Sequence, residues 1–186
     1  MAPTGSDWIH EVKHDGFRMQ AHLRDGRVRL LMITGVDWTE RYPLIVNGVG
    51  RIKAKSAILD GEAALCDHNG IAVFDRMVER IDEATACFLA FDLLELNGED
   101  LRKRPLLERK SKLRTLLGSK PRVGLAYVRH VKGYGTAHFE NACKLGLEGI
   151  VSKYGPSSYK SGKAKTWVKV KNPKAPGFLR HVNGEW

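Results

Sequence analysis

The sequence has few of the features that mark membrane proteins, secreted proteins or proteins stabilised by a structural metal ion. No apolar run approaches the roughly 20 residues that a transmembrane helix needs, and the start of the chain is short and polar, unlike a signal peptide. The three cysteines, Cys66, Cys87 and Cys143, form no Cys-x-x-Cys pair. This odd, scattered set argues against a disulfide framework and against a structural zinc site, and it favours free thiols in a reducing cytosol.

Several motifs of nucleotide-binding proteins and hydrolases are also missing. The chain has no phosphate-cradling Gly-x-x-x-x-Gly-Lys-[Ser/Thr] loop, because Ser157 replaces the first glycine of the nearest match and Ala164 its last residue. It has no Gly-x-Ser-x-Gly elbow and no His-Glu-x-x-His helix. His10 and His14 are spaced like metal ligands on a helix, but the glycine that follows breaks any helix there. If the protein binds a nucleotide, it therefore uses a different binding motif.

The net charge of +10 is divided unevenly along the chain. Residues 1–100 hold 11 Lys+Arg and 17 Asp+Glu, a net charge of −6, whereas residues 101–186 hold 20 and 4, a net charge of +16. A basic half of this size is typical of proteins that bind a polyanion, although a solvated basic face gives the same count. Phosphate contacts of this kind carry no sequence preference.

Short segments of strand and helix character alternate along the chain and predict an α+β fold, with antiparallel β-sheets flanked by helices. Strands are predicted at 8–12, 17–23, 28–32, 56–65, 87–94, 148–153 and 166–170. Turn pairs are predicted at Asp25-Gly26, Asn69-Gly70 and Asn97-Gly98. Helices are predicted at 42–52, 74–80, 105–117 and 136–145.

Lys13 is the first residue with a chemical interpretation. It ends a predicted strand directly before Asp15-Gly16, where glycine permits a sharp turn or a close approach to a ligand. A lysine that points into a basic, partly desolvated pocket loses its proton more easily, and the neutral amine can attack phosphorus. Taken alone, Lys13 fits an exposed strand lysine beside a turn better than it fits a nucleophile.

Later segments add acids and lysines of the kind that phosphoryl-type transfer requires. Glu62 follows an apolar strand in an acidic turn, and Glu148 stands at the mouth of another apolar strand. Lys169 and Lys171 lie two residues apart on a strand and therefore point to the same face, where an anion lying across them would offset their repulsion. A carboxylate that holds a hard metal ion, together with paired lysines, can stabilise charge developing at phosphorus.

In this order, the segments resemble the covalent nucleotidyltransferases and, more closely, the adenylation domain of ATP-dependent DNA ligases of the bacterial end-joining type. The resemblance covers residues 7–172 and begins with the Lys-x-Asp-Gly-x-Arg signature from Lys13 to Arg18. The segments at 60–62, 88–94, 148–153 and 167–171 follow in the order of the family. It implies an ATP-grasp-like adenylation fold, with residues 1–6 as a flexible leader and 173–186 as a tail that adds no OB-fold domain.

The resemblance also implies roles for individual residues. Lys13 would form a lysyl-AMP bond, and Lys169 and Lys171 would act as catalytic residues that grip the α-phosphate of ATP. Glu148, together with Glu62, would hold a divalent metal ion, Mg²⁺ or Mn²⁺.

The remaining implied roles concern the nucleotide. Glu11 and Val12 would flank the adenine, and Phe91 would stack on it, which is worth roughly 1–3 kcal/mol per base. Arg18 and Glu62 would contact the ribose or the adjoining phosphate. From the pattern alone, Phe91 also fits an ordinary core residue, and Glu62 a turn-capping acid.

The resemblance implies nicked double-stranded DNA as the substrate, a role in DNA repair or recombination, and a bacterial cytoplasmic or nucleoid location. The chain ends before the OB-fold domain of the family, so we expect a protein partner to supply that domain. Ile33 stands where the family usually has an arginine that touches the nick phosphate. A non-catalytic ATP- or DNA-binding module, or a nucleotidyltransferase acting on RNA, remains an alternative.

Overall fold

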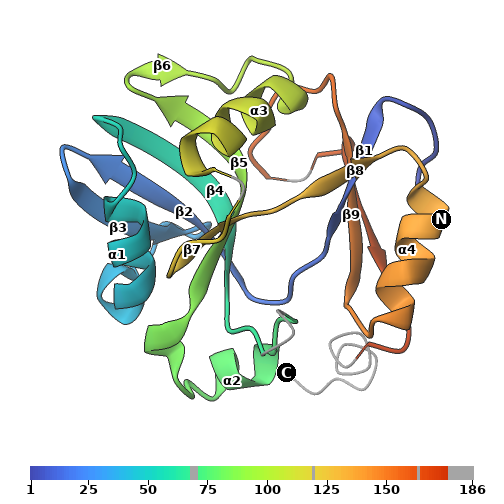
Figure 1. Ribbon diagram of the computed structural model, residues 1–186, viewed down its shortest axis with the longest axis horizontal. Helices are drawn as coiled ribbons and strands as arrows, with labels where there is room; N and C mark the ends of the chain where they lie inside the picture. The colour runs from blue at the N-terminus through green and yellow to red at the C-terminus, as the bar shows by residue number, and fades with distance from the viewer. Residues whose placement is uncertain (68–70, 119, 163, 176–186) are drawn as a thin grey trace.

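Two β-sheets stand side by side and form the frame of the molecule. The computed structural model describes residues 1–67, 71–118, 120–162 and 164–175 (Figure 1). One sheet has four antiparallel strands in the order β10-β9-β1-β8: β1 (Trp8–Val12), β8 (His130–Lys132), β9 (Gly149–Tyr154) and β10 (Trp167–Lys171). We call it the small sheet.

The second sheet, called the large sheet, has the order β3-β2-β4-β5-β6, with β7 paired to β5. Its strands are β2 (Phe17–Arg24), β3 (Arg27–Met32), β4 (Ser56–Ala64), β5 (Cys87–Leu96), β6 (Glu99–Asp100) and β7 (Leu125–Tyr127). The helices are α1 (Pro43–Gly50), α2 (Phe74–Val78), α3 (Leu106–Leu117) and α4 (Gly135–Lys144). Two short 3₁₀ turns, Thr39–Arg41 and Glu83–Thr85, complete the described elements. The antiparallel sheets with flanking helices confirm the predicted α+β class.

The predicted hairpin turns follow from residues that tolerate left-handed backbone angles. Asp25 and Gly26 have φ angles of 48° and 76°, which suit the tight turn between β2 and β3. Asn97 and Gly98, with φ angles of 50° and 89°, turn the chain from β5 into β6. Asn69-Gly70 lies outside the described residues.

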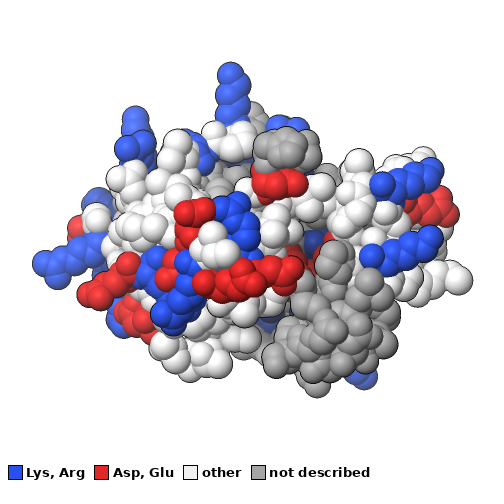
Figure 2. Space-filling view, turned by 90° about the horizontal axis from the view of Figure 1, so that it is seen from below, with Lys and Arg blue, Asp and Glu red and all other residues white. Residues whose placement is uncertain are grey.

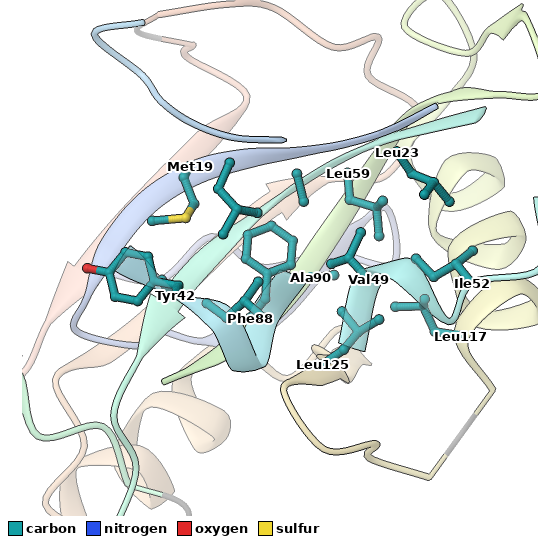
Figure 3. Close-up of a cluster of buried hydrophobic side chains, with 14 of the residues drawn as sticks. Met19, Leu23, Tyr42, Val49, Ile52, Leu59, Phe88, Ala90, Leu117 and Leu125 are labelled. Atoms are coloured by element: carbon teal, nitrogen blue, oxygen red, sulfur yellow. The ribbon is translucent and has the colours of Figure 1, made fainter. Parts of the chain in front are cut away.

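The main core lies between the large sheet and the helices α1 and α3 (Figure 3). On β2, Met19, Ala21 and Leu23 are buried at every second position, as the alternation of a strand requires. Phe88 on β5 and Tyr42 before α1 are fully buried in the same cluster. On the small sheet, Ile150 packs against Ala142 of α4. A smaller cluster around Ala64, Leu89 and Val128 also buries part of β4 and β5 outside the main core.

Three short strands, β6, β7 and β8, were not predicted from the sequence. β7 and β8 have three residues each, too few for an alternating pattern to stand out. β7 pairs with β5 in parallel, so it departs from the antiparallel pattern of its sheet. Among the described residues, no helix is both long enough and apolar enough to cross a membrane.

The chain crosses from one sheet to the other directly after β1. β1 belongs to the small sheet and β2 to the large one, so residues 13–16 form the crossing, drawn in blue between the two sheets in Figure 1. Gly16 is required there because a Cβ atom would stand 2.2 Å from the carbonyl oxygen of Ala63. The segment carrying Lys13 is therefore pressed against the end of β4.

Gly61 offers a test of how tightly β4 and β5 pack. A Cβ atom at this position would lie 2.5 Å from Cζ of Phe88 and 2.8 Å from the carbonyl oxygen of Leu89. Gly61→Ala should therefore lower the free energy of unfolding by about 2 kcal/mol, as overpacking usually does. Urea denaturation followed by circular dichroism measures the change.

Gly50→Ala is the matched control. The nearest atom to a Cβ at Gly50 is 3.8 Å away, on Val28, and the residue ends helix α1. This substitution should leave stability unchanged or raise it by up to about 1 kcal/mol, because alanine favours helix. Equal effects of the two substitutions would contradict the packing argument.

Candidate active site

A cavity of about 260 Å³ opens between the two sheets, and most of the predicted site residues line it. The crossing segment after β1 forms one wall, β4 and β5 form a second, and β9 and β10 form a third. The predicted residues that line it are Glu11, Val12, Lys13, Arg18, Glu62, Phe91 and Lys169. The fold thus brings together residues that lie up to 158 positions apart in the sequence (Glu11 to Lys169, 169 − 11).

Glu148 lines a second cavity, of about 220 Å³, which shares Val12, Lys13, His14 and Asp15 with the first. Lys171 lines neither cavity. It lies on β10 two residues beyond Lys169, where its register partner is Gly149. By register, Lys171 therefore lies opposite the residue whose carbonyl oxygen accepts the hydrogen bond of the Lys13 amide.

Lys13 makes an ion pair with Glu148. The two side chains are only 14% and 9% exposed, so the pair is largely shielded from water. The backbone amide of Lys13 donates to the carbonyl oxygen of Gly149 at 2.9 Å, which fixes the segment against β9. The amine consequently lies at the boundary of the two cavities with one carboxylate as its direct partner.

The ionisation of Glu62 is set by its surroundings. Burial raises the pKa of Glu62 to about 7, even though Lys13, Lys169 and Arg18 oppose the shift. Burial also lowers the pKa of Lys169, and repulsion from Lys13 adds to that shift. Near neutral pH the cavity therefore holds a carboxyl group that readily exchanges a proton beside two lysines.

Arg18 binds Asp60 rather than Glu62. Its guanidinium donates to the two carboxylate oxygens at 2.7 and 3.2 Å, and the hydroxyl of Tyr159 donates to the same carboxylate at 2.9 Å. The guanidinium carbon also lies 5.6 Å from the ring centre of Phe91 and 5.3 Å from that of Trp167. Arg18 is thus held in place beside an aromatic pair.

Glu11 is almost fully buried between two lysines. Its carboxylate pairs with Lys110 of α3 and, at 2.6 Å, with Lys153 of β9. The Lys153 ammonium lies 4.0 Å from the ring centre of Phe91 and 3.9 Å from that of Trp167. These contacts place a cluster of charged groups against the rings of Phe91 and Trp167, which line the cavity.

Sequence reasoning did not single out three of these residues. Trp167 shares the alternation of Lys169 and Lys171 on one strand, so the face of the strand could have pointed to it. Lys153 ends an apolar strand, and its burial breaks the rule that lysines are exposed. Lys110 lies on a charged helix, and no sequence signal distinguishes it from its exposed neighbours.

The two predicted metal ligands both face Lys13. Glu148 pairs with Lys13 directly, and the positive charge of Lys13 favours the ionised form of Glu62. Within the described parts of the chain, no group of three or more His, Cys, Asp or Glu side chains could form a metal site alone. Mg²⁺ is commonly held by one or two carboxylates together with substrate phosphates. The donor set therefore fits a metal ion that arrives with a polyphosphate, not a resident protein cage.

The sequence matches the profile of the family described as "ATP dependent DNA ligase domain" over residues 2–171. A multifunctional non-homologous end joining protein LigD of Pseudomonas aeruginosa is 34% identical over 172 residues, 91% of this chain and 20% of that protein. A DNA ligase of Pyrobaculum calidifontis is 32% identical over 186 residues, 92% of this chain and 32% of that protein. The chain thus spans between a fifth and a third of these relatives.

Solved structures give the same grouping. The ligase domain of LigD from M. tuberculosis superposes with a TM-score of 0.80 and 32% identity, over 90% of this chain and 56% of that one. A mycobacterial DNA ligase D complexed with ATP and MES gives a TM-score of 0.77 and 30% identity, over 92% and 58%. The Chlorella virus DNA ligase-adenylate, at 14% identity over 89% of this chain and 62% of that one, shares the fold with a TM-score of 0.63.

The raised pKa of Glu62 predicts how this residue affects stability. Because its pKa is about 7 in the folded protein and 4.5 without the fold, the folded state binds the proton more tightly. Stability is therefore lost as pH rises from about 4.5 to 7. Glu62→Gln, which cannot ionise, should be more stable than the wild type above pH 7 by up to about 3 kcal/mol.

The measurement is thermal or urea unfolding of both proteins between pH 4 and pH 8, in the presence of EDTA to remove divalent ions. The advantage of the glutamine variant should disappear near pH 4, where Glu62 is protonated in both states. Glu40→Gln, at an exposed position, is the control and should show no such pH dependence. A constant difference across the range would refute the assignment.

Proposed function

The chain belongs to the family of ATP-dependent DNA ligase domains, and on that premise we propose that it transfers AMP from ATP to DNA ends through a covalent lysine adduct on Lys13. The observation that carries this proposal is the position of the Lys13 amine. It lies where two cavities meet, with Glu148 as its partner and Glu62 and Lys169 close enough to interact electrostatically.

The first step is attack of the Lys13 amine on the α-phosphorus of ATP. A nitrogen–phosphorus bond forms, the bond from that phosphorus to the bridging oxygen breaks, and pyrophosphate leaves. Lys13 must first separate from Glu148 and lose a proton to solvent. A divalent ion held by Glu148 and Glu62 would neutralise phosphate charge, and Lys169, with Lys171 farther along the strand, would do the same from β10.

The base of the nucleotide fits the aromatic end of the cavity. Phe91 and Trp167 meet edge to face with their ring centres 5.7 Å apart, and Val151 lines the same space. Glu11 is ionised and fixed by its two lysines, so its carboxylate can accept a hydrogen bond from an exocyclic amine. Arg18, beside Phe91, can reach a ribose hydroxyl or phosphate oxygen.

Two further transfers complete the proposed cycle. AMP passes from Lys13 to the 5′-phosphate of a nick, and the 3′-hydroxyl then attacks that phosphate and releases AMP. Ile33, where the family usually has an arginine, is 71% exposed in the loop after β3. It offers no charge to a nick phosphate. We therefore propose that a protein partner bearing an OB-fold domain supplies part of the contacts to DNA.

The test of adenylation is incubation of the 186-residue chain with α-labelled ATP and Mg²⁺ or Mn²⁺. A labelled protein band that survives denaturation is expected, with the label mapped to Lys13 by peptide analysis. Lys13→Ala should reduce labelling to background, because among the described residues Lys13 is the only lysine that borders both cavities. Lys132→Ala, at an exposed site on β8, should label like the wild type. Unlabelled wild-type protein would favour a non-catalytic binding module.

DNA binding is proposed to depend on the basic half of the chain. The face seen in Figure 2 carries intermixed acidic and basic side chains, so the basic excess is not concentrated there. Lys160 and Lys165 are exposed in the segment between β9 and β10. Replacing both with alanine should reduce the slope of log affinity for nicked DNA against log salt by about 1.8 (0.9 per lost phosphate contact).

Lys53→Ala/Lys55→Ala is the matched control, with the same charge change at exposed positions of the acidic half. It should leave the slope unchanged in a fluorescence-anisotropy titration. An equal loss in both double variants would show that only net charge matters. Tighter binding or better sealing of RNA ends would instead support an RNA-directed nucleotidyltransferase.

A further inference from the structure

Helix α3 carries two consecutive cations that are fully buried, Arg109 and Lys110. Each binds a carboxylate of a different sheet. Arg109 donates two hydrogen bonds of 2.8 Å to Asp92 on β5, in the large sheet. Lys110 pairs with Glu11 on β1, in the small sheet. One turn of one helix is therefore bonded to both walls of the cavity.

The ammonium group of Lys110 is enclosed by groups of the protein. It forms an ion pair with the Glu11 carboxylate, donates hydrogen bonds to the carbonyl oxygens of Phe91 at 3.2 Å and Val128 at 3.1 Å, and lies 4.7 Å from the ring centre of Tyr127. Its side chain is not part of the cavity lining. Lys110 therefore acts on a bound molecule only through the groups that it holds.

Those groups are the two residues between which a base would lie. Glu11 and Phe91 belong to different sheets, both line the cavity, and both are bonded to the same nitrogen atom. We infer that Lys110 is a positioning residue that fixes the distance between the Glu11 carboxylate and Phe91, and thereby sets the affinity for the purine base of ATP. This inference rests on the proposed function for the identity of the ligand.

Charge balance explains why Lys110 can be removed without unfolding the protein. The cluster contains one carboxylate, Glu11, and two ammonium groups, Lys110 and Lys153. Removing Lys110 leaves the Glu11–Lys153 pair intact, so no buried charge loses its last partner. What is lost is the bond between the two sheets.

Lys110→Met should therefore raise the ATP concentration that gives half-maximal formation of the lysyl adduct by about tenfold, the lower end of what supporting contacts of a site contribute. The rate at saturating ATP should stay within about twofold of the wild type, since Lys13, Glu62 and Lys169 are untouched. Lys112→Met is the matched control, on the same helix but exposed. It should change neither quantity.

A double-mutant cycle separates positioning from a general loss of structure. If Lys110 acts through Glu11, Glu11→Gln/Lys110→Met should bind ATP about as weakly as Glu11→Gln alone. A further tenfold loss in the double variant would overturn the inference. If Lys110→Met alone fails to fold, Lys110→Gln, which keeps an amide donor for the carbonyl oxygens of Phe91 and Val128, takes its place in the cycle with the same expected outcomes.

ATP affinity is best measured by calorimetry in the Lys13→Ala background, where no adduct forms. An unchanged dissociation constant on adding Lys110→Met would overturn the positioning role, even if the wild type is adenylated. Conversely, weaker ATP binding in Lys110→Met would support the inference even if the wild type forms no adduct. The positioning role of Lys110 and the adenylation of Lys13 are therefore tested by different measurements, and one can be contradicted without the other.

Discussion

The site depends on the buried ion pairs that the Glu11 carboxylate makes with Lys110 and Lys153. Burial alone would raise the pKa of Glu11, but Lys110 and Lys153 together lower it, so the group is charged inside the protein. The cluster keeps an excess of positive charge, and the rings of Phe91 and Trp167 face Lys153 at cation–π distance. Aromatic and charged residues of the site are thus in direct contact.

The same principle of mutual dependence applies to the groups around Lys13. Glu62 is kept partly protonated by burial, while Lys13 and Lys169 favour its charged form. Lys169 is in turn easier to deprotonate because Lys13 is near. These groups come from the segment after β1, from β4 and from β10, so their protonation states are properties of the assembled sheets and not of any single segment.

Strands and turns with strong local signals could be predicted from the sequence. The alternation of β2 and the Asp25-Gly26 pair determine that hairpin by themselves. Lys13, Glu62, Phe91 and Lys169 were predicted to share a site, and they line one cavity, although their chemical roles remain predictions. Lys110 could not be found this way, because its burial depends on how α3 packs across both sheets. β7 escaped prediction because its pairing with β5 is not local.

The crossing segment has a consequence for the order of events around the amine. Lys13, His14 and Asp15 line both cavities, so each cavity borders the Lys13 side chain. In the proposed cycle, AMP on Lys13 would keep its base in one cavity while the DNA end approaches from the other. ATP and DNA would then not compete for the same volume.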